Sequence, residues 1–306
     1  MIEVNELTKR YGSRTAVDRL SFTVRPGRVT GFLGPNGAGK TTTLRMILGL
    51  DAPTGGTATV SGVPLRTHPR GLRHVGALLD AGQVHGGRTA AAHLSALARS
   101  NGIPLRRVAD VLHEVGLAEA ATSRIGGFSL GMKQRLGIAT ALLGDPPVLM
   151  FDEPINGMDP EGVLWVRRLF RRLAAEGRTV FLSSHLMSEM ENTADQLVVI
   201  GRGQLIAAES VRDFAARGTR LGILVGTPQT AELAAVLTGA GASVEPEGSP
   251  GAEKLVVTGL SADRIGALAL QHRILLNELT TRSSSLEEAF MELTADSVEY
   301  LAGQPR

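Results

Sequence analysis

The first residues that could carry chemistry form a glycine-rich segment ending in a lysine and two threonines. It follows an apolar run over 29–33, precedes a helix pattern over 40–50, and comprises Gly34, Pro35, Asn36, Gly37, Ala38, Gly39, Lys40, Thr41 and Thr42. This spacing and context are typical of a phosphate-binding loop, whose backbone N–H groups and helix N-terminus face phosphate oxygens. Lys40 is expected to reach the β- and γ-phosphates, Thr41 to bind Mg²⁺, and Thr42 to contact an α-phosphate. The segment predicts nucleotide binding; the alternative is a glycine-rich turn with a solvated lysine.

Two neighbouring carboxylates, Asp152 and Glu153, end the apolar run 148–151. The carboxyl ends of parallel strands form the ligand-binding edge of a sheet, so both acids are expected at that edge. Asp152 would hold Mg²⁺ through its water shell, and Glu153 would orient and deprotonate the attacking water. Two solvent-facing acids at a strand end are the alternative, which pairing with the phosphate loop disfavours.

The elements that position these motifs alternate between buried-strand and helix patterns, which predicts an α/β sheet that is mainly parallel in its centre. Strands are expected at 2–7, 20–24, 29–33, 57–61, 75–79, 148–151 and 179–183, with a hairpin-like pair at 196–200 and 204–207. Helices are expected at 40–50, 90–100, 106–115, 133–143, 160–175 and 187–193.

The pattern restarts near residue 211, which predicts a domain boundary there and a small α+β module over 211–306. In that module strands are expected at 221–225, 255–257 and 274–278, helices at 211–216, 231–240, 262–271 and 286–293, and a loop at 245–251. The module shows no catalytic signature.

Composition excludes several classes of function. The 306 residues include 43% hydrophobic and 20% charged residues, which is ordinary for a globular chain. Only 4% are aromatic and the net charge is +2, so nucleic-acid binding is not expected. The chain has no Cys, and no apolar run approaches the roughly 18 residues that span a bilayer. The sequence predicts a cytoplasmic chain that contacts a membrane only through a partner.

A family resemblance rests on the segment Phe128-Ser129-Leu130-Gly131-Met132-Lys133-Gln134-Arg135, followed by the acids after residue 151. The segment resembles the signature of the nucleotide-binding subunits of ATP-binding-cassette (ABC) transporters, and the resemblance spans about residues 2–210. It implies a P-loop NTPase of the ABC cassette type, an ATP-binding domain over 1–210 with a helical subdomain at about 85–145, and an accessory module over 211–306. The commonest family version has Gly where Leu130 stands. The Ser-Leu-Gly-Met form resembles the drug and bacitracin-type export branch.

The resemblance implies further site residues. Ser129 and Gly131 would face the γ-phosphate of an ATP held by the other subunit, and Asp159 resembles the acid of the loop that communicates between subunits. His185 resembles the switch histidine that contacts the γ-phosphate and the attacking water. Tyr11 resembles the aromatic residue that stacks on adenine, with a surface tyrosine as the alternative.

One position departs from the family pattern. The family usually has a Gln after the strand corresponding to 75–79, where it senses Mg²⁺ and faces the membrane partner. Here the aligned residue is Asp80, which could ligate or water-bridge Mg²⁺. Gln83 is the alternative, and the gapless alignment favours Asp80.

The resemblance thus implies an ATPase with ATP and Mg²⁺ as cofactors, in which Glu153, His185 and Lys40 are catalytic. Two cassettes would stack head to tail as an ATP-bound homodimer. A heterodimer with another cassette is the alternative. They would drive a separate integral membrane permease at the cytoplasmic face of the inner membrane, exporting a drug, antibiotic, peptide or lipid. The segment 285–290 resembles tails of drug-export cassettes that dimerise or regulate. There are two rival functions. A soluble ABC ATPase of ribosomes or DNA is disfavoured by the single phosphate loop and the lack of heptads. A non-catalytic regulator is disfavoured because Lys40, Asp152, Glu153 and His185 are all present.

Overall fold

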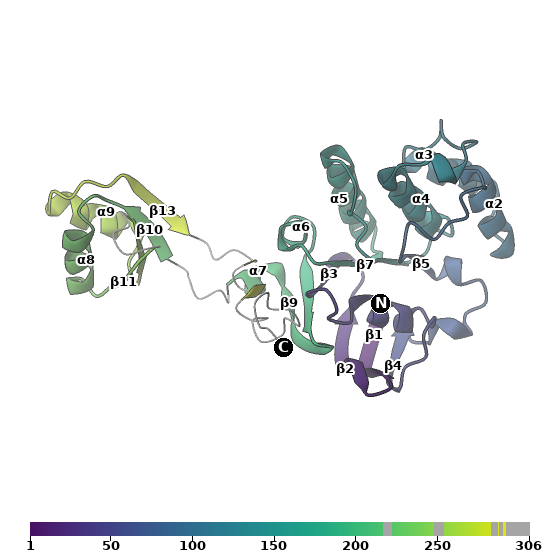
Figure 1. Cartoon of the computed structure of the whole chain (residues 1–306), viewed down its shortest axis with the longest axis horizontal. Helices are drawn as coiled ribbons and strands as arrows, with labels where there is room; N and C mark the ends of the chain where they lie inside the picture. The colour runs from purple at the N-terminus through teal and green to yellow at the C-terminus, as the bar shows by residue number, and fades with distance from the viewer. Residues whose placement is uncertain (217–221, 248–253, 283–286, 288–289, 292–306) are drawn as a thin grey trace, which may run out of the picture. The chain divides into compact units, whose positions relative to one another are not determined.

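The computed structural model describes residues 1–216, 222–247, 254–282, 287, 290 and 291. The chain divides into two compact units, Met1–Val211 and Arg212–Glu292, each of which has its own hydrophobic core (Figure 1). Each unit is considered separately below.

The first unit is built on a six-stranded sheet whose first five strands are parallel and whose last strand, β9, is antiparallel. Its central strands β6 and β7 are fully buried and mostly apolar, as parallel sheets covered on both faces require. The predicted mixed, centrally parallel sheet is therefore confirmed. In spatial order the strands are β5 (Val75–Leu78), β6 (Val148–Phe151), β7 (Thr179–Ser184), β3 (Arg28–Leu33), β8 (Gln196–Gly201) and β9 (Gln204–Ser210).

A three-stranded antiparallel sheet packs near the phosphate-loop end of this unit. Its strands in spatial order are β2 (Arg14–Val24), β1 (Ile2–Tyr11) and β4 (Gly55–Val60). Phe22 of this sheet packs against Phe32 and Phe181 of the large sheet, with ring centroids 5.7 and 5.8 Å away. This aromatic contact joins the two sheets into one core and fixes the strand that leads into the phosphate loop.

The helices of the first unit fall into groups that Figure 1 separates. Helix α1 (Lys40–Ile47) follows β3, and α5 (Pro160–Ala175) follows β6. Helices α2 (Ala90–Ser100), α3 (Arg106–Glu114) and α4 (Leu130–Leu142) contact one another as a separate group. The short elements of this unit are η1 (Leu65–Thr67), η2 (Gly71–Arg73), η3 (Ile125–Gly127) and α6 (Met187–Glu191). Helix α7 (Val211–Ala215) begins at the boundary and belongs mostly to the second unit.

Two helix ends differ from the sequence prediction. Helix α4 begins at Leu130 rather than 133, because the Ser129 hydroxyl accepts a hydrogen bond from the N–H of Met132 and caps the helix three residues earlier. Gly131 therefore lies inside the first turn rather than before the helix. Helix α1 ends at Ile47 rather than 50, since Gly49 has φ 69° and breaks the helical conformation.

Helix α4 and strand β5 approach so closely that only glycine fits at position 76. A Cβ built on Gly76 would overlap the backbone carbonyl of Ala141, whereas a Cβ on Gly71 would meet no atom within 4 Å. We expect Gly76→Ala to lower the free energy of unfolding by about 1–3 kcal/mol and Gly71→Ala, its matched control, to change it little. Urea unfolding followed by circular dichroism measures both. Equal effects of the two substitutions would contradict this close packing.

The second unit has the element order β-α-β-β-α-β. Its antiparallel sheet runs β11-β12-β10-β13, and its core is formed with two helices. In chain order the elements are β10 (Gly222–Gly226), α8 (Thr230–Gly239), β11 (Ser243–Pro246), β12 (Lys254–Thr258), α9 (Ala262–Gln271) and β13 (Glu278–Arg282).

Sequence reasoning misplaced two elements of this unit. The strand predicted at 274–278 is a connection whose Ile274 is buried in the core, and the strand itself begins at Glu278. The loop predicted at 245–251 begins later, because Glu245 and Pro246 belong to β11. The predicted helix 286–293 and the motif 285–290 fall largely outside the described residues.

Candidate active site

The phosphate loop connects β3 to α1. Gly39 has φ 103°, and a Cβ there would lie 2.5 Å from the carbonyl oxygen of Ala16, so both the conformation and the close approach require glycine. The hairpin turn between β8 and β9 supports the loop from another side, since the N–H of Gly203 donates to the carbonyl of Ala38 over 3.0 Å. The loop is thus held open at the amino end of α1, where backbone N–H groups favour an anion.

Lys40 lies beneath this loop, and its side chain is only 7% exposed. Its Nζ donates to the carbonyl oxygens of Gly34, at 2.6 Å, and Pro35, at 3.3 Å. Burial lowers the pKa of Lys40, while the charges of Glu153 and Asp152 oppose that shift. Phosphate groups in the loop would favour the charged lysine further.

Asp152 is buried at the carboxyl end of β6. Its Oδ2 accepts a hydrogen bond from Thr41 Oγ1 at 2.6 Å, and its Oδ1 accepts one from Ser183 Oγ of β7. The same serine oxygen accepts from the N–H of Glu153 at 3.0 Å. Strands β6 and β7 thus place the carboxylate against the first turn of α1, as predicted from their parallel arrangement.

Glu153 occupies the left-handed region, with φ 49°, an uncommon conformation for a non-glycine residue. Its Oε2 lies 3.0 Å from His185 Nδ1, and its Oε1 lies 4.0 Å from Lys40 Nζ. Lys40 and His185, which are 113 and 32 positions from Glu153 in the sequence, therefore meet its carboxylate at one sheet edge. Such backbone strain is common at functional sites.

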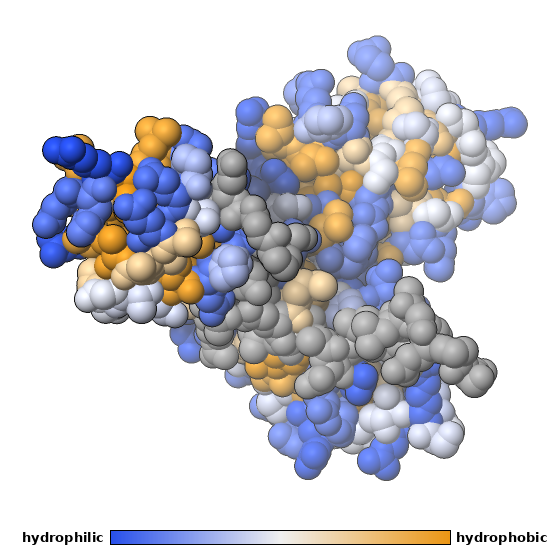
Figure 2. Space-filling model, turned by 60° about the vertical axis from the view of Figure 1, so that its left-hand side comes forward, coloured by the Kyte–Doolittle hydropathy of each residue, from blue (hydrophilic) through white to orange (hydrophobic). Residues whose placement is uncertain are grey.

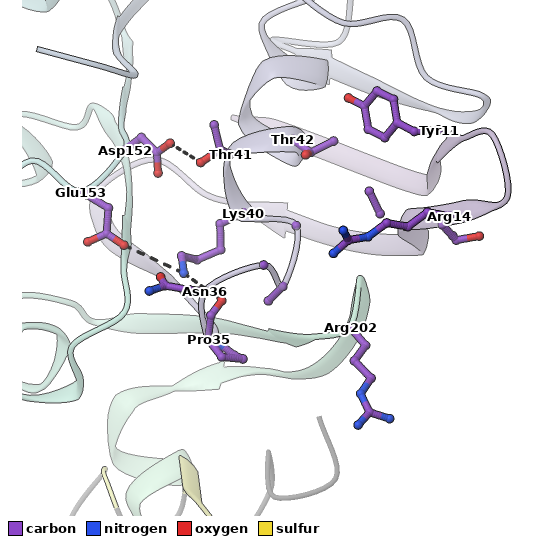
Figure 3. A pocket seen from close by; sticks show the side chains of 15 residues that line it. Tyr11, Arg14, Pro35, Asn36, Lys40, Thr41, Thr42, Asp152, Glu153 and Arg202 are labelled. Carbon is purple, nitrogen blue, oxygen red and sulfur yellow. Dashed lines mark hydrogen bonds and ion pairs between the residues drawn. The ribbon is translucent and has the colours of Figure 1, made fainter. Parts of the chain in front are cut away.

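The loop and the acids line a cavity of about 800 Å³. Figure 3 shows Asp152 and Glu153 on one side of the glycine-rich loop and Tyr11 on the other. Tyr11 is 52% exposed and lies at the end of β1, with Lys9 Nζ 5.0 Å from its ring centroid. The cavity is therefore long enough to have a phosphate end and an aromatic end. Its lining comprises Tyr11, Arg14, Thr15, Ala16, residues 35–42, Asp152, Glu153 and Arg202.

Sequence reasoning missed Arg14 and Arg202 in this lining. Arg14 opens β2 three residues after Tyr11, and Arg202 lies in the turn between Gly201 and Gly203. A basic residue flanked by glycines in a hairpin turn gave no signal of its own. Only the contact between that turn and the phosphate loop brings it to the cavity.

Glu189 is a third residue that the sequence did not point to. It accepts a hydrogen bond from Ser184 Oγ at 2.8 Å, and that oxygen accepts one from the N–H of Leu186 at 2.9 Å. These bonds brace the backbone on both sides of His185. Burial raises the pKa of Glu189, and the Ser184 hydrogen bond opposes the shift.

Six predicted site residues do not line this cavity. Two of them contact residues that do: Gly34 accepts a hydrogen bond from Lys40, and His185 contacts Glu153. The other four are Ser129, Gly131, Asp159 and Asp80. Ser129 caps α4, and Asp159 caps α5 by accepting a 2.8 Å hydrogen bond from the N–H of Gly162. Gly131 lies close to the segment before α5, since a Cβ on it would lie 3.5 Å from the carbonyl oxygen of Gly157. These three residues therefore lie near one another, apart from the phosphate loop. Asp80 Oδ1 accepts the N–H of Gly82 at 2.7 Å in the turn after β5.

The site combines a strand, a glycine-rich loop and a helix with two carboxylates. Asp152 accepts a hydrogen bond from Thr41, and Glu153 lies 4.0 Å from Lys40. This combination defines a P-loop nucleotide hydrolase. A family model described as "ABC transporter" matches residues 17–156. A second, described as a domain of unknown function, matches residues 221–287.

One of two curated relatives extends the match over nearly the whole chain. An uncharacterized ABC transporter ATP-binding protein, YhcH of Bacillus subtilis (strain 168), is 34% identical over 305 residues, or 98% of this chain and 97% of that protein. The bacitracin transport ATP-binding protein BcrA of Bacillus licheniformis is 44% identical over 209 residues, or 67% of this chain and 68% of that protein. The chain belongs to the ABC transporter ATP-binding proteins, and as their ATP-binding subunit it binds and hydrolyses ATP.

Solved structures agree on the fold. A structure of an ATP-binding subunit of an ABC transporter is similar with a TM-score of 0.65 and 28% identity, covering 71% of this chain and 92% of that one. The dimeric bacterial ABC transporter cassette MJ0796 has a TM-score of 0.64 at 21% identity, over 69% and 98% of the two chains. Subunits of this family dimerise and work with membrane permease partners. Within the described residues, no helix combines the length and apolarity of a transmembrane span.

Proposed function

We propose that this chain powers the export of an antibiotic-like peptide or lipid-linked compound through a separate permease, as an ATP-bound homodimer at the cytoplasmic face of the inner membrane. Convergence of Glu153, His185 and Lys40 at one sheet edge supports the hydrolytic part of the proposal. The names of relatives support the export part. Besides bacitracin transport, they include Nod factor export in Ralstonia nicotianae and lantibiotic transport in Streptococcus pyogenes.

Residues 1–210 act as the ATP-binding domain in this proposal, with a helical subdomain at about 85–145, and residues 211–306 act as an accessory module. The triphosphate lies in the loop from Gly34 to Thr42, whose N–H groups and Lys40 neutralise its charge. Adenine stacks on Tyr11 at the other end of the cavity, which supplies a flat and exposed aromatic face.

Mg²⁺ is part of the proposal because the oxygens present suit it. Thr41 Oγ1 and Asp152 Oδ2 are adjacent at 2.6 Å beside the phosphate loop, and Mg²⁺ prefers such oxygen ligands together with substrate phosphates. Thr41 would ligate the ion and Asp152 would hold it directly or through water. When bound, the ion neutralises charge on the β- and γ-phosphates.

Asp80 is proposed as the residue that senses Mg²⁺. We expect Asp80→Asn to weaken Mg²⁺-dependent hydrolysis on the order of tenfold, and more than Gln83→Ala does. An asparagine keeps the oxygen that accepts the Gly82 N–H, so the turn persists and the charge alone is removed. Phosphate release across a Mg²⁺ titration measures both variants. A larger loss from Gln83→Ala would show that the sensing residue is Gln83.

Hydrolysis in this proposal uses Glu153 as the base that takes a proton from the attacking water. His185 holds the Glu153 carboxylate through its 3.0 Å contact and contacts the γ-phosphate side of that water. Ser129, Gly131 and Asp159 lie outside the cavity of their own subunit, which supports their use on the ATP of the partner subunit. ATP would then hold two subunits together until its γ-phosphate is released.

The export proposal can be tested in inside-out membrane vesicles that contain this chain and its permease partner. We expect ATP-dependent accumulation of labelled bacitracin or a labelled lantibiotic, and none with Glu153→Gln. ATP-dependent uptake only in right-side-out vesicles loaded with ATP would instead show import. ATP hydrolysis without transport of either probe in either orientation would contradict the antibiotic-export proposal.

A further inference from the structure

The second unit presents two sheet edges. Its β-α-β-β-α-β order and four-stranded antiparallel sheet match the split β-α-β arrangement, in which the two helices cover one face. Strands β11 and β13 lie at the outer edges, each with one side that pairs with no described strand. Such an edge is a template for adding another strand, and proteins usually block it.

Only one of these two edges is blocked. Strand β11 has four residues, ends in Pro246 and carries Glu245, and both proline and charge prevent edge pairing. Strand β13 has five residues, and its central Leu279, Thr280 and Thr281 are exposed. These three residues include no proline and no charge, and threonine favours strand structure. Among the described residues, the centre of the β13 edge therefore lacks the proline and the charge that the β11 edge carries.

Three exposed leucines lie on β13 and on the two segments that precede it in the chain. Leu279 is 37% exposed and packs beside α9, where a Cβ on Gly266 would lie 3.7 Å from Leu279 Cδ2. Leu270, at the end of α9, is 81% exposed, and Leu275, in the connection to β13, is 61% exposed. Figure 2 shows hydrophobic surface on this unit among hydrophilic residues. A partner on this edge would cover surface that is costly to leave in water.

We propose that β13 pairs antiparallel with β13 of a second copy of this chain, about a two-fold axis at Thr280, so that two four-stranded sheets form one. This inference rests on the homodimer of the proposed function. In that register Thr280 faces Thr280 of the second copy and Leu279 faces its Thr281. Residues 279 and 281 share one face of the strand, so the pairing keeps the helices of both copies on one side and brings the two Leu279 side chains into reach of each other.

A second copy fits this edge better than an unrelated peptide. An antiparallel strand pairs with itself through identical groups, as a two-fold interface requires. Glu278 is already paired with Lys254 at 2.9 Å, so its negative charge is offset at the edge. Subunits of this family act in pairs, which holds two such edges in one complex at an effective concentration on the order of millimolar. A pairing of five residues, which would be weak between free chains, is then sufficient to join the two sheets.

The absence of cysteine from the chain permits a direct test. Residues directly opposite in an antiparallel pair have Cα atoms about 4.5–5.5 Å apart, within the range that a disulfide bridges. Full-length Thr280→Cys, in ATP and Mg²⁺ and with copper phenanthroline and oxygen as oxidant, is expected to form a disulfide dimer. The matched control is Ser243→Cys on β11, which is also exposed. We expect at least tenfold less dimer from it on a non-reducing gel.

The strand register of the proposed β13 pairing can be tested independently. Leu279→Cys alone is expected to cross-link poorly, and a mixture of Leu279→Cys with Thr281→Cys is expected to cross-link well, since these positions face each other only in the proposed pairing. Equal cross-linking of Thr280→Cys and Ser243→Cys, or no gain on mixing, would overturn the proposal. Dimerisation in ATP is measured separately by light scattering, so failure of the homodimer is distinguished from failure of this pairing. ATP-dependent homodimers without cross-linking at position 280 would overturn this inference alone.

Discussion

Glu153→Gln is expected to bind ATP as the wild-type chain does and to hydrolyse it about 10²–10⁴ times more slowly. The amide keeps the shape of the side chain and can still bond to His185, 3.0 Å from the carboxylate oxygen, but it cannot accept the proton of the attacking water. With the γ-phosphate retained, an ATP-bound dimer should accumulate. Phosphate release and size-exclusion chromatography in ATP measure the two effects.

The matched control for this substitution is Glu161→Gln, which changes an exposed acid in the first turn of α5. It should hydrolyse ATP normally and form no lasting dimer. Normal turnover by Glu153→Gln would show that another group takes the proton. A folded variant that neither hydrolyses nor binds ATP would show that Glu153 serves binding instead.

Lys40→Ala and Ser129→Arg should each abolish most hydrolysis as homodimers and should complement each other when mixed. Loss of Lys40 removes charge-assisted bonds to the phosphates, which should weaken ATP binding about 10- to 100-fold. Ser129→Arg places bulk on the surface that faces the other subunit's ATP, while its own phosphate loop is intact. In a mixed dimer both lesions fall in one site, and the other site has an intact Lys40 and an intact Ser129.

After exchange of an equal mixture, about half of the dimers are mixed by random pairing. Light scattering should then show ATP-driven dimerisation, and phosphate release should recover if one site can act alone. Ser129→Ala is the control for the bulk of the arginine. It removes the same hydrogen bond from Met132 N–H but adds no bulk to the surface. Recovery of neither quantity, from folded variants that exchange subunits, would contradict a site shared between two subunits.

The candidate site was largely predictable because its chemistry is local in sequence. The phosphate loop needs a fixed spacing of glycines before Lys40, and the acids must end a buried strand, so both signals are contained in short windows. The strand and helix pattern then placed Asp152 and Glu153 at the same sheet edge as the loop. Arg14, Arg202 and Glu189 carry no such signal, since they reach the site only through strand pairing and turn contacts.

The sequence by itself determined the class of enzyme, the centrally parallel sheet and the residues proposed to bind ATP, since local spacing and buried apolar runs encode them. Tertiary structure decided what depends on distant segments meeting. It brought His185 against Glu153, placed Ser129 and Asp159 outside the cavity, and began β13 at Glu278 rather than 274. The run 274–276 was misread as a strand because Ile274 is buried in the core of the second unit without pairing in the sheet. Hydrophobic periodicity indicates which residues are buried, but only the packing of the folded chain decides which elements bury them.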